Sequence, residues 1–319
     1  MDTKKKVLKK KRAKQRKRRR IVSITIISLI ILLIVFLVSI NSTLGRMKRT
    51  TIDDKNLEIS DKFKTSDTYT KEYRDVVNIA FFGLDEKVDD IQRSDAIMIG
   101  TLDPINNKIK ITSFMRDSYV DIPDYGYDKL NHAYAYGGAP LAIRTLNENF
   151  GLNIEDFVSV NFSSLPQIID ILGGITIDIT EEEISHIPGV SSTGPTLLTG
   201  KQALAYSRIR YASGDDYERT HRHRNVMSAV FTKALNAPPK SYPNILNNIL
   251  PLVQTNLSSG DFVSLATKVV GLGSGNLEQE RFPRDGDGTG DMSTGIYYLK
   301  FDIETVKKQM RDYIFNDKK

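Results

Sequence analysis

The run from Ile21 to Ile40 limits what this chain can fold into more than any other segment does. Its 20 residues include no charged residue, Gly or Pro, and only four of them are polar. A helix of about 20 residues spans about 30 Å, the thickness of the hydrocarbon core of a bilayer. A buried helix rarely runs so long without a polar stripe, and a cleaved signal peptide usually has an apolar region of only about 7–15 residues. The run therefore predicts an uncleaved transmembrane anchor at residues 21–40.

The charges on the two sides of this run predict its orientation. Residues 1–20 hold 13 Lys or Arg and one acidic residue, whereas the other 299 residues hold 32 basic and 38 acidic ones. Because basic segments beside a span stay in the cytoplasm, we expect a cytoplasmic tail at 1–20 and an extracellular location for 41–319, as in a single-pass type II protein of the cell membrane. A basic run also suits nucleic acid. Beside a membrane, topology and anionic lipids explain it better, so we predict no nucleic-acid partner.

Beyond the anchor, the sequence predicts a polar extracellular stalk at residues 41–75 and one α/β domain at 76–319. Six strands are expected, at about Val76–Asp85, Ala96–Asp103, Lys108–Asp117, Phe157–Phe162, Ile175–Ile179 and Gln279–Phe282. Seven helices are expected, at about Pro140–Phe150, Ser164–Leu172, Lys201–Arg208, Glu218–Asn236, Tyr242–Leu257, Asp261–Val270 and Asp302–Phe315. Strands that alternate with helices in this way indicate a layered α/β fold.

Charged residues gather at the ends of the first three strands. Asp85 ends the first strand, Arg93 and Asp95 precede the second, and Arg116 follows the third. Open α/β sheets bind their ligands at strand ends. If the first two strands are neighbours, the two carboxylates are able to hold one Mg²⁺, which prefers hard oxygen ligands and retains waters. Acids in a solvated loop are the competing interpretation.

A second cluster is rich in Arg. Five Arg and two His fall within 17 residues: Arg208, Arg210, Arg219, His221, Arg222, His223 and Arg224. Arg219, Arg222 and His223 share one face of the expected helix. Converging guanidinium groups bind phosphate or pyrophosphate, which Arg engages with two hydrogen bonds. A solvated helix face that pairs with nearby acids is the alternative.

Several other kinds of site are excluded. The chain has no Cys, which rules out disulfides, Cys-ligated metals and a cysteine nucleophile. The segment GPTLLTGK (194–201) looks like a P-loop, but five residues separate its glycines and Gln202 replaces the required Ser or Thr. The four His lack zinc-ligand spacing, and no G-x-S-x-G motif is present. Phosphoryl chemistry with Mg²⁺ and Arg remains.

Seven segments stand in a characteristic order: FFGLD (81–85), RSDAIMIGTLDP (93–104), SFMRDSYVDIP (113–123), DKLNHAYAYGG (128–138), VNFSSLPQIIDILGG (160–174), LLTGKQALAYSRIRY (197–211) and DDYERTHRHRNVM (215–227). They cover about residues 76–234, and in order and spacing they resemble the LytR-CpsA-Psr proteins of Gram-positive cell walls. The resemblance implies an α/β/α sandwich with a central mixed sheet and an apolar polyprenyl tunnel. Apolar faces of the later helices, such as Val226 and Val230 or Ile245 and Ile249, would either line that tunnel or pack on the sheet.

The resemblance also implies an activity. Members of the family move a glycopolymer, such as teichoic acid or capsule, from an undecaprenyl-pyrophosphate carrier onto peptidoglycan. The C6 hydroxyl of N-acetylmuramic acid is the acceptor, a phosphodiester forms, and undecaprenyl phosphate is released. The implied cofactor is Mg²⁺, with Mn²⁺ as a substitute.

The family's site residues carry over by position. Asp85 and Asp95 match the metal ligands, and together with Arg116 and Arg219 they form the implied catalytic set. The implied pyrophosphate contacts are Arg93, Arg116, Arg208, Arg210, Arg219, Arg222 and His223. His223-Arg224 replaces the family's Gln-Gln, which puts the handling of the head group or the acceptor in question. The alternative function is a non-catalytic polyprenyl-pyrophosphate-binding sensor of wall stress, but the presence of both aspartates favours the enzyme.

Overall fold

The computed structural model describes the chain at residues 48–52, 57–59, 76–85, 87, 91–209, 215–238, 241–272 and 276–318. The predicted cytoplasmic tail (1–20) and membrane anchor (21–40) lie outside these residues. In the described part of the chain, no helix combines the length and the hydropathy that crossing a bilayer requires. Residues Met47–Lys319 form one compact unit.

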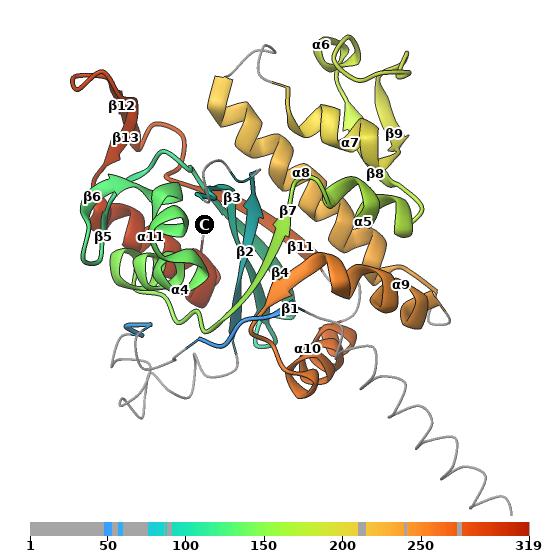
Figure 1. The fold of residues 1–319 in the computed structure, drawn as a ribbon, viewed down its shortest axis with the longest axis horizontal. Coiled ribbons are helices and arrows are strands. Elements are labelled where there is room, and N and C mark those ends of the chain that lie inside the picture. Colours follow the sequence, from blue (N-terminus) through green and yellow to red (C-terminus); the bar gives the residue numbers. More distant parts are fainter. Residues whose placement is uncertain are drawn as a thin grey trace, which may run out of the picture. The chain divides into compact units, whose positions relative to one another are not determined.

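A mixed sheet of seven strands runs through the described part of this unit (Figure 1). The strands are β1 (Lys48–Arg49), β2 (Val77–Leu84), β3 (Ser94–Asp103), β4 (Lys108–Phe114), β7 (Asp156–Asn161), β10 (Val253–Thr255) and β11 (Asn276–Phe282), in the order β1–β10–β7–β2–β3–β4–β11. β2, β3 and β4 pair antiparallel one after another, while β7 runs parallel to β2 and β11 parallel to β4. The carboxyl ends of β2, β4, β7 and β11 therefore meet at one edge, together with the start of β3.

Helices cover both faces of this sheet (Figure 1). α4 (Leu130–Phe150) and α11 (Ile303–Asn316) lie on one face, and α5 (Leu165–Ile171) and α8 (Asp215–Leu235) lie on the other. The layered α/β fold with a mixed central sheet, expected from the sequence, is confirmed.

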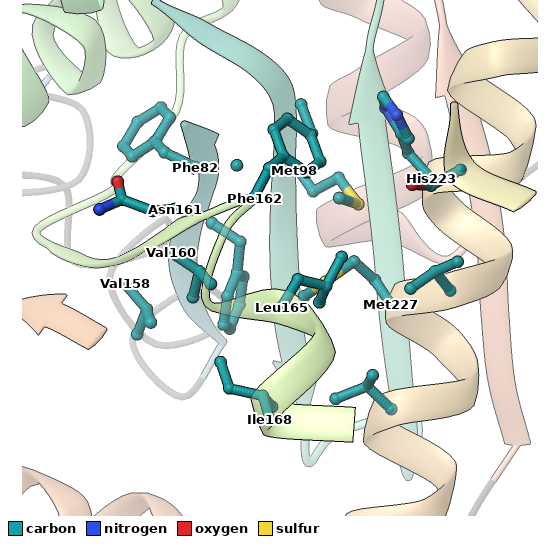
Figure 2. A pocket seen from close by; sticks show the side chains of 16 residues that line it. Phe82, Met98, Val158, Val160, Asn161, Phe162, Leu165, Ile168, His223 and Met227 are labelled. Carbon is teal, nitrogen blue, oxygen red and sulfur yellow. The ribbon is translucent and has the colours of Figure 1, made fainter. Parts of the chain in front are cut away.

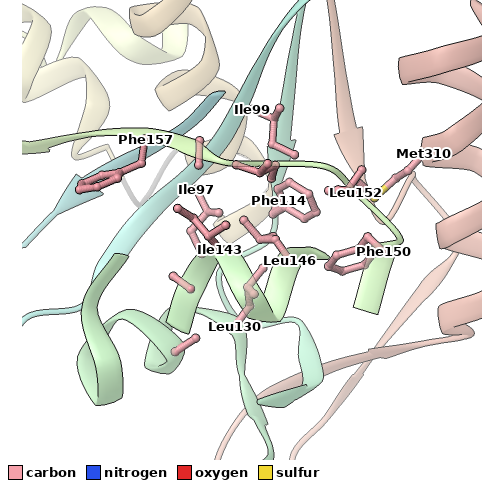
Figure 3. Packing of buried hydrophobic residues seen from close by; sticks show 14 of the residues in the cluster. Ile97, Ile99, Phe114, Leu130, Ile143, Leu146, Phe150, Leu152, Phe157 and Met310 are labelled. Atoms are coloured by element: carbon pink, nitrogen blue, oxygen red, sulfur yellow. The ribbon is translucent and has the colours of Figure 1, made fainter. Parts of the chain in front are cut away.

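Side chains alternate along the strands and so build a core on each face, because successive residues of a strand point to opposite sides. In β2, Phe82 belongs to the cluster shared with α4 and α11, whereas Phe81 belongs to the cluster shared with α8. Figure 3 shows the first cluster, in which Ile97 of β3 lies near Ile143 and Leu146 of α4. Burying a side chain of this size contributes about 1.5–3 kcal/mol. The central strands are thus held from both sides.

Smaller elements surround the layers. Three hairpins are formed by β5 (Tyr119–Ile122) with β6 (Gly126–Lys129), β8 (Ile175–Ile179) with β9 (Gly194–Leu198), and β12 (Gly288–Asp291) with β13 (Tyr298–Phe301). The further helical elements are α6 (Glu181–Ile184), α7 (Gly200–Ser207), α9 (Tyr242–Ile249), the 3-10 turn η3 (Leu250–Leu252) and α10 (Ser259–Leu272).

Helix α4 begins well before its predicted start at Pro140. The sequence favours a loop there because the segment is rich in Tyr and Gly, yet the helix starts at Leu130, whose side chain is buried in the core. Gly137 and Gly138 interrupt it with non-helical backbone angles, and the φ of 65° at Gly138 suits a residue without a Cβ. Pro140 therefore opens only the second part of α4. The predicted end before Gly151 is confirmed.

Two other predicted elements have a different place in the fold. Ile175–Ile179 is a strand, but it does not resume the central sheet, since β8 pairs with β9 in a separate hairpin. The helix predicted over Tyr242–Leu257 ends at Ile249, and Val253–Thr255 forms β10 within the central sheet. Pro251 lacks the amide hydrogen that would continue the helix, and the β-branched residues after it favour a strand.

Parts of the predicted stalk (41–75) belong to the domain. β1 pairs in parallel with β10 at the edge of the sheet. Leu57 and Ile59 are buried in the core beneath α4, and Asn147 Nδ2 donates a hydrogen bond of 2.9 Å to the carbonyl oxygen of Leu57. The domain boundary predicted at Val76 is therefore too late, because these earlier residues complete the sheet and the core.

A buried lysine ties the sheet to helix α11 at the edge opposite the meeting strand ends. The side chain of Lys110, in β4, is 0% exposed, and its Nζ lies 3.0 Å from Asp103 Oδ2 and 3.1 Å from Asp317 Oδ1. It also donates a hydrogen bond of 2.9 Å to the carbonyl oxygen of Tyr313. Removing an ammonium group from water costs several kcal/mol unless partners of this kind replace the water. β3, β4 and α11 are therefore mutually dependent.

Replacing this lysine should destabilise the domain strongly. Lys110→Met is expected to lower the free energy of unfolding by about 3–5 kcal/mol, because Asp103 then stays buried without its cation. Lys308→Met is the matched control: Lys308 pairs with Asp312 on the surface, and its loss should cost less than about 1 kcal/mol. Urea unfolding followed by circular dichroism measures both. Equal losses for the two variants would contradict the anchoring role of Lys110.

Candidate active site

Two acidic residues meet at the edge where β2 ends and β3 begins. Leu84 pairs with Ser94, and the amide of Asp85 donates a hydrogen bond of 3.1 Å to the carbonyl oxygen of Arg93. Because β2 and β3 are antiparallel neighbours, Asp85 and Asp95 lie at the same edge of the sheet. The adjacency of these two strands, on which the predicted carboxylate pair depends, is confirmed.

Beside this pair, oppositely charged side chains form a continuous row. Arg116, just after β4, places Nη1 3.0 Å from Asp95 Oδ2 and Nε 3.3 Å from Asp117 Oδ2. Lys129 Nζ lies 2.7 Å from Asp117 Oδ1. The side chains of Asp95 and Asp117 are 7% and 6% exposed, whereas those of Arg116 and Lys129 are 23% and 16% exposed. The buried carboxylates thus fix the cations through ion pairs. Because the cations are more exposed, an anion that approaches the site contacts them first.

Two further cations near this edge are not among the predicted site residues. Lys129 lies within the segment DKLNHAYAYGG, so a signal for it was present in the resemblance. Arg281, near the end of β11, forms an ion pair with Asp285, and its Nη1 lies 3.6 Å from the sulfur of Met115. No motif covers Arg281, and only the parallel pairing of β11 with β4 brings it opposite Ser113, near the end of β4.

The structure describes only some of the other predicted arginines. Arg93 is exposed at the start of β3, and Arg208 is exposed at the C-cap of α7. Arg210 and the side chain of Arg219 lie outside the described residues. The phosphate-binding roles of these four residues stay predictions.

Arg222 and His223 stand next to each other on α8 but have different surroundings. Arg222 is 3% exposed, and its Nε donates a hydrogen bond of 2.9 Å to Glu183 Oε1. This buried ion pair joins α8 to α6, so the structure holds Arg222 in the interior, in contrast to the pyrophosphate contact predicted for it. His223 lines a pocket, with its ring 5.5 Å from that of Phe162.

The pocket lies between the sheet and helices α5 and α8 (Figure 2). It contains about 620 Å³ of empty space, part of which is open to solvent. Its lining consists of Phe81, Phe82, Gly83, Ala96, Met98, Val158, Val160, Asn161, Phe162, Leu165, Ile168, Ser207, His223, Val226, Met227 and Val230. Three of these residues, Asn161, Ser207 and His223, have polar side chains, so the pocket suits an apolar ligand.

One wall of this pocket adjoins the charged edge. Gly83 lies two residues before Asp85, and Ala96 directly follows Asp95. A Cβ on Gly83 would come within 2.9 Å of the Cβ of Ala96, so the lack of a side chain permits this close approach. A ligand with its apolar tail in the pocket would therefore bring a polar head close to the two carboxylates and Arg116.

The apolar faces of the later helices differ in their relation to this pocket. Val226 and Val230 of α8 line it. Ile245 and Ile249 of α9 are not among its lining residues. For α9, the alternative interpretation of ordinary packing therefore fits better.

The carboxylate pair fits the metal that was predicted. Within the described ranges, no group of three or more His, Cys, Asp or Glu side chains is placed to hold a metal ion. Mg²⁺ is commonly bound by only one or two carboxylates, together with waters and the phosphates of a substrate. Asp85 and Asp95, on neighbouring strand ends beside cations that attract phosphate, are a donor set of that kind.

The fold and this edge define a class of protein: an α/β domain in which an apolar pocket adjoins a row of cations and carboxylates. Such a site suits a ligand with an apolar tail and a phosphorylated head. The sequence profile of the LytR_cpsA_psr family matches residues 34–313, and the chain therefore belongs to the LytR-CpsA-Psr family. The match extends in both directions beyond residues 76–234.

Relatives with named activities agree with this assignment. The polyisoprenyl-teichoic acid--peptidoglycan teichoic acid transferase TagU of Enterococcus faecalis (strain ATCC 700802 / V583) is 31% identical over 265 residues, which cover 81% of this chain and 85% of the relative. TagU of Bacillus mycoides (strain KBAB4) is 34% identical over 225 residues, which cover 70% and 72% of the two chains.

Solved structures share the fold. TagT bound to LIIa-WTA superposes with a TM-score of 0.63 and 27% identity, over 76% of this chain and 91% of that chain. The LytR-CPS2A-psr family protein YwtF (TagT) with bound octaprenyl pyrophosphate lipid superposes with a TM-score of 0.59 and 26% identity, over the same shares of the two chains.

The buried position of Arg222 leads to a prediction. Arg222→Ala should lower the free energy of unfolding by about 3–5 kcal/mol, because Glu183 is left buried without its partner. Arg208→Ala, at an exposed position, should change it by about 0.5 kcal/mol or less. Thermal and urea unfolding of the two variants measure the difference. If the Arg222→Ala protein is fully stable but has lost phosphate binding, the result would instead support the predicted contact between Arg222 and the pyrophosphate.

Proposed function

We propose that this protein transfers a glycopolymer from an undecaprenyl-pyrophosphate carrier to the C6 hydroxyl of N-acetylmuramic acid in peptidoglycan. The observation that carries this proposal is the contact between two unlike environments: an apolar pocket and, at its wall, the row that joins Asp95, Arg116, Asp117 and Lys129. An amphiphilic lipid pyrophosphate needs both. The relatives named as teichoic acid transferases, and the family member with a bound octaprenyl pyrophosphate lipid, support the same substrate class.

The protein's own residues divide the work. The pocket holds the prenyl chain next to the sheet and excludes water from it. Arg116, turned toward the edge by two carboxylates, would bind the pyrophosphate and stabilise charge as the transition state forms. Arg93, Arg208, Arg210 and Arg219 would add further guanidinium groups, and His223 would contact the head group from the pocket side.

The reaction makes one P–O bond and breaks another. The sugar hydroxyl oxygen attacks the phosphorus nearest the glycopolymer, and the bond from that phosphorus to the bridging oxygen breaks. Undecaprenyl phosphate leaves with the electron pair, and whichever of Asp85 and Asp95 is not bound to the metal accepts the hydroxyl proton. The pyrophosphate linkage is itself energy-rich, so no nucleotide is required.

We assign the metal site to Asp85 and Asp95. Bound there, Mg²⁺, or Mn²⁺ in its place, would neutralise charge on the pyrophosphate. The donor set that supports this assignment is the pair of carboxylates on the neighbouring ends of β2 and β3.

The charge distribution supports a place for this reaction at the outer face of the cell membrane. The basic residues 1–20 would stay in the cytoplasm and the run at 21–40 would span the bilayer. The domain would then face both the lipid carrier and the cell wall.

The full-length protein in detergent tests the activity. It is incubated with a synthetic polyprenyl-pyrophosphate glycan, peptidoglycan oligomers and Mg²⁺, and release of polyprenyl monophosphate is followed. Arg116→Ala, Arg219→Ala and Asp95→Ala are each expected to reduce transfer by about 10²–10³-fold, as loss of a group that stabilises transition-state charge usually does. Arg311→Ala, on α11, is the control and should retain activity.

Two results would change this conclusion. Normal transfer by a well-folded Arg116→Ala protein would refute the role of Arg116. Tight lipid binding by the wild-type protein without any release would favour the non-catalytic sensor of wall stress.

The pocket gives a second test that depends on chain length. Val230→Trp fills part of the pocket, so it should weaken binding of a long-chain polyprenyl pyrophosphate by roughly tenfold or more, equivalent to about 1.4 kcal/mol. Binding of a short-chain analogue, which needs less of the pocket, should change little. Titration of both lipids with the wild-type and variant proteins measures this contrast. An equal loss of affinity for both lipids would indicate that the prenyl chain binds outside this pocket.

A further inference from the structure

Five tyrosines gather beside the charged edge, three of them exposed and two half-buried. The tyrosine patch consists of Tyr119, Tyr125, Tyr127, Tyr136 and Tyr298, from the β5–β6 hairpin, α4 and β13. Tyr125, Tyr127 and Tyr136 are 56%, 63% and 42% exposed. Exposed aromatic rings that gather in one place usually mark a binding surface.

The rings are arranged in two groups. Tyr125 stacks on Tyr136, with centroids 4.7 Å apart and planes 14° apart. Tyr119 lies 5.3 Å from Tyr127 and 4.9 Å from Tyr298, measured between ring centroids. The patch therefore presents ordered ring faces and edges to the solvent.

Asp128 joins the two groups of rings. Its carboxylate accepts a hydrogen bond of 2.6 Å from the hydroxyl of Tyr136 and one of 3.4 Å from that of Tyr298, and it lies 2.8 Å from His132 Nδ1. Burial alone would raise the pKa of Asp128, but the hydrogen bonds from Tyr136 and His132 hold it below its usual range. The same bond to Asp128 raises the pKa of Tyr136 to about 12. At neutral pH the patch thus combines ring faces with an ionised carboxylate and with hydroxyl oxygens that can accept hydrogen bonds, because their hydrogens point to Asp128.

Contacts connect the patch to the proposed catalytic residues. Lys129 Nζ lies 5.8 Å from the centre of the Tyr298 ring and 2.7 Å from Asp117, which in turn pairs with Arg116. The amide of Leu299, next to Tyr298, donates a hydrogen bond of 2.9 Å to the carbonyl oxygen of Asp117. A ligand on the patch would therefore lie next to the row of charges.

The patch and the apolar pocket lie on opposite sides of this row. The pocket is formed with α5 and α8, whereas β5, β6, β12 and β13 lie on the side of α4 and α11 (Figures 1 and 2). In phosphoryl transfer, the attacking and leaving oxygens are roughly in line through phosphorus. If the leaving lipid phosphate points into the pocket, the attacking hydroxyl must arrive from the side of the patch.

The charges around the patch are largely paired. The segment from Tyr119 to Lys129 contains three Asp and one Lys, and Asp124 pairs with Arg144 while Asp291 of β12 pairs with Lys300. The patch therefore has no excess of cations that would attract an anionic lipid surface or a phosphate-rich polymer. A sugar chain, whose rings have apolar faces and hydroxyl edges, matches tyrosine faces bordered by hydrogen-bonding groups.

We propose that the tyrosine patch binds the glycan strand of the acceptor peptidoglycan and orients its hydroxyl toward Arg116 and Asp95. This inference rests on the proposed transfer reaction for the identity of the acceptor. The patch tyrosines are positioning residues, because they hold the acceptor without contacting the reacting phosphorus.

Binding and kinetics of the full-length protein in detergent test the proposal. The probe is a soluble peptidoglycan oligomer that carries no glycopolymer. Tyr127→Ala and Tyr125→Ala should each raise the dissociation constant and the KM for this oligomer by roughly five- to tenfold, the scale of one lost aromatic contact. The kcat at saturating oligomer and the dissociation constant for the polyprenyl-pyrophosphate donor should stay unchanged.

Two control variants define what the rings contribute. Tyr127→Phe keeps the ring and should keep most of the oligomer affinity. Ile105→Ala removes a side chain of similar exposure, 55%, from the turn between β3 and β4 at the opposite edge of the sheet. It should change neither constant.

Three outcomes would overturn the proposal. Unchanged oligomer binding in both alanine variants would show that the acceptor binds elsewhere. A loss confined to donor binding would assign the patch to the donor glycan, and a loss confined to sedimentation with anionic phospholipid vesicles would assign it to the membrane. A fourth outcome separates the two proposals. If the wild-type protein binds the oligomer through Tyr127 but releases no polyprenyl phosphate, the patch is an oligomer-binding site and the proposed transfer reaction is wrong.

Discussion

The placement of β3 between β2 and β4 is the constraint on which the site depends. Its antiparallel pairing on both sides brings the start of β3 to the edge where its neighbours end. Asp95 thereby comes beside Asp85 on one side and within 3.0 Å of Arg116 on the other. A shift of one residue in this pairing would turn Asp95 toward the opposite face. The two cores that hold β3 from both sides therefore also hold Asp95 in its position at the candidate active site.

This edge also separates two kinds of surface. On one side, the sheet with α5 and α8 forms a pocket with almost no polar side chains, and on the other the hairpins form the tyrosine patch. The row from Asp95 to Lys129 lies between them, and its carboxylates compensate the charge of its cations. An anion that binds to Arg116 must compete with Asp95 and Asp117. This competition lowers the affinity of Arg116 for an anion.

Much of this was predictable from the sequence, and the failures have physical causes. The central strands and Asp85, Asp95 and Arg116 follow from apolar runs that end in charged residues, a local signal. The interior position of Arg222 was not foreseen, because helical spacing shows which residues share a face but not that Glu183 is buried opposite it. Lys129 comes to the edge through the β5–β6 hairpin, and Arg281 comes there only through the pairing of β11 with β4, a contact between segments far apart in the sequence. β10 was missed because three residues carry too little periodicity to outweigh the helical pattern before them.

The partners of Lys110 have a consequence for how the chain reaches its folded state. Asp103 lies nearby in the sequence, but the carbonyl oxygen of Tyr313 and the carboxylate of Asp317 come from α11 and the residue that caps it. A ribosome makes β4 long before it makes α11. Until α11 has emerged, the position that Lys110 occupies in the finished core offers its ammonium group only part of the required partners. The burial of Lys110 is therefore complete only once α11 has packed against β4, which makes this step of folding depend on residues about 200 positions away.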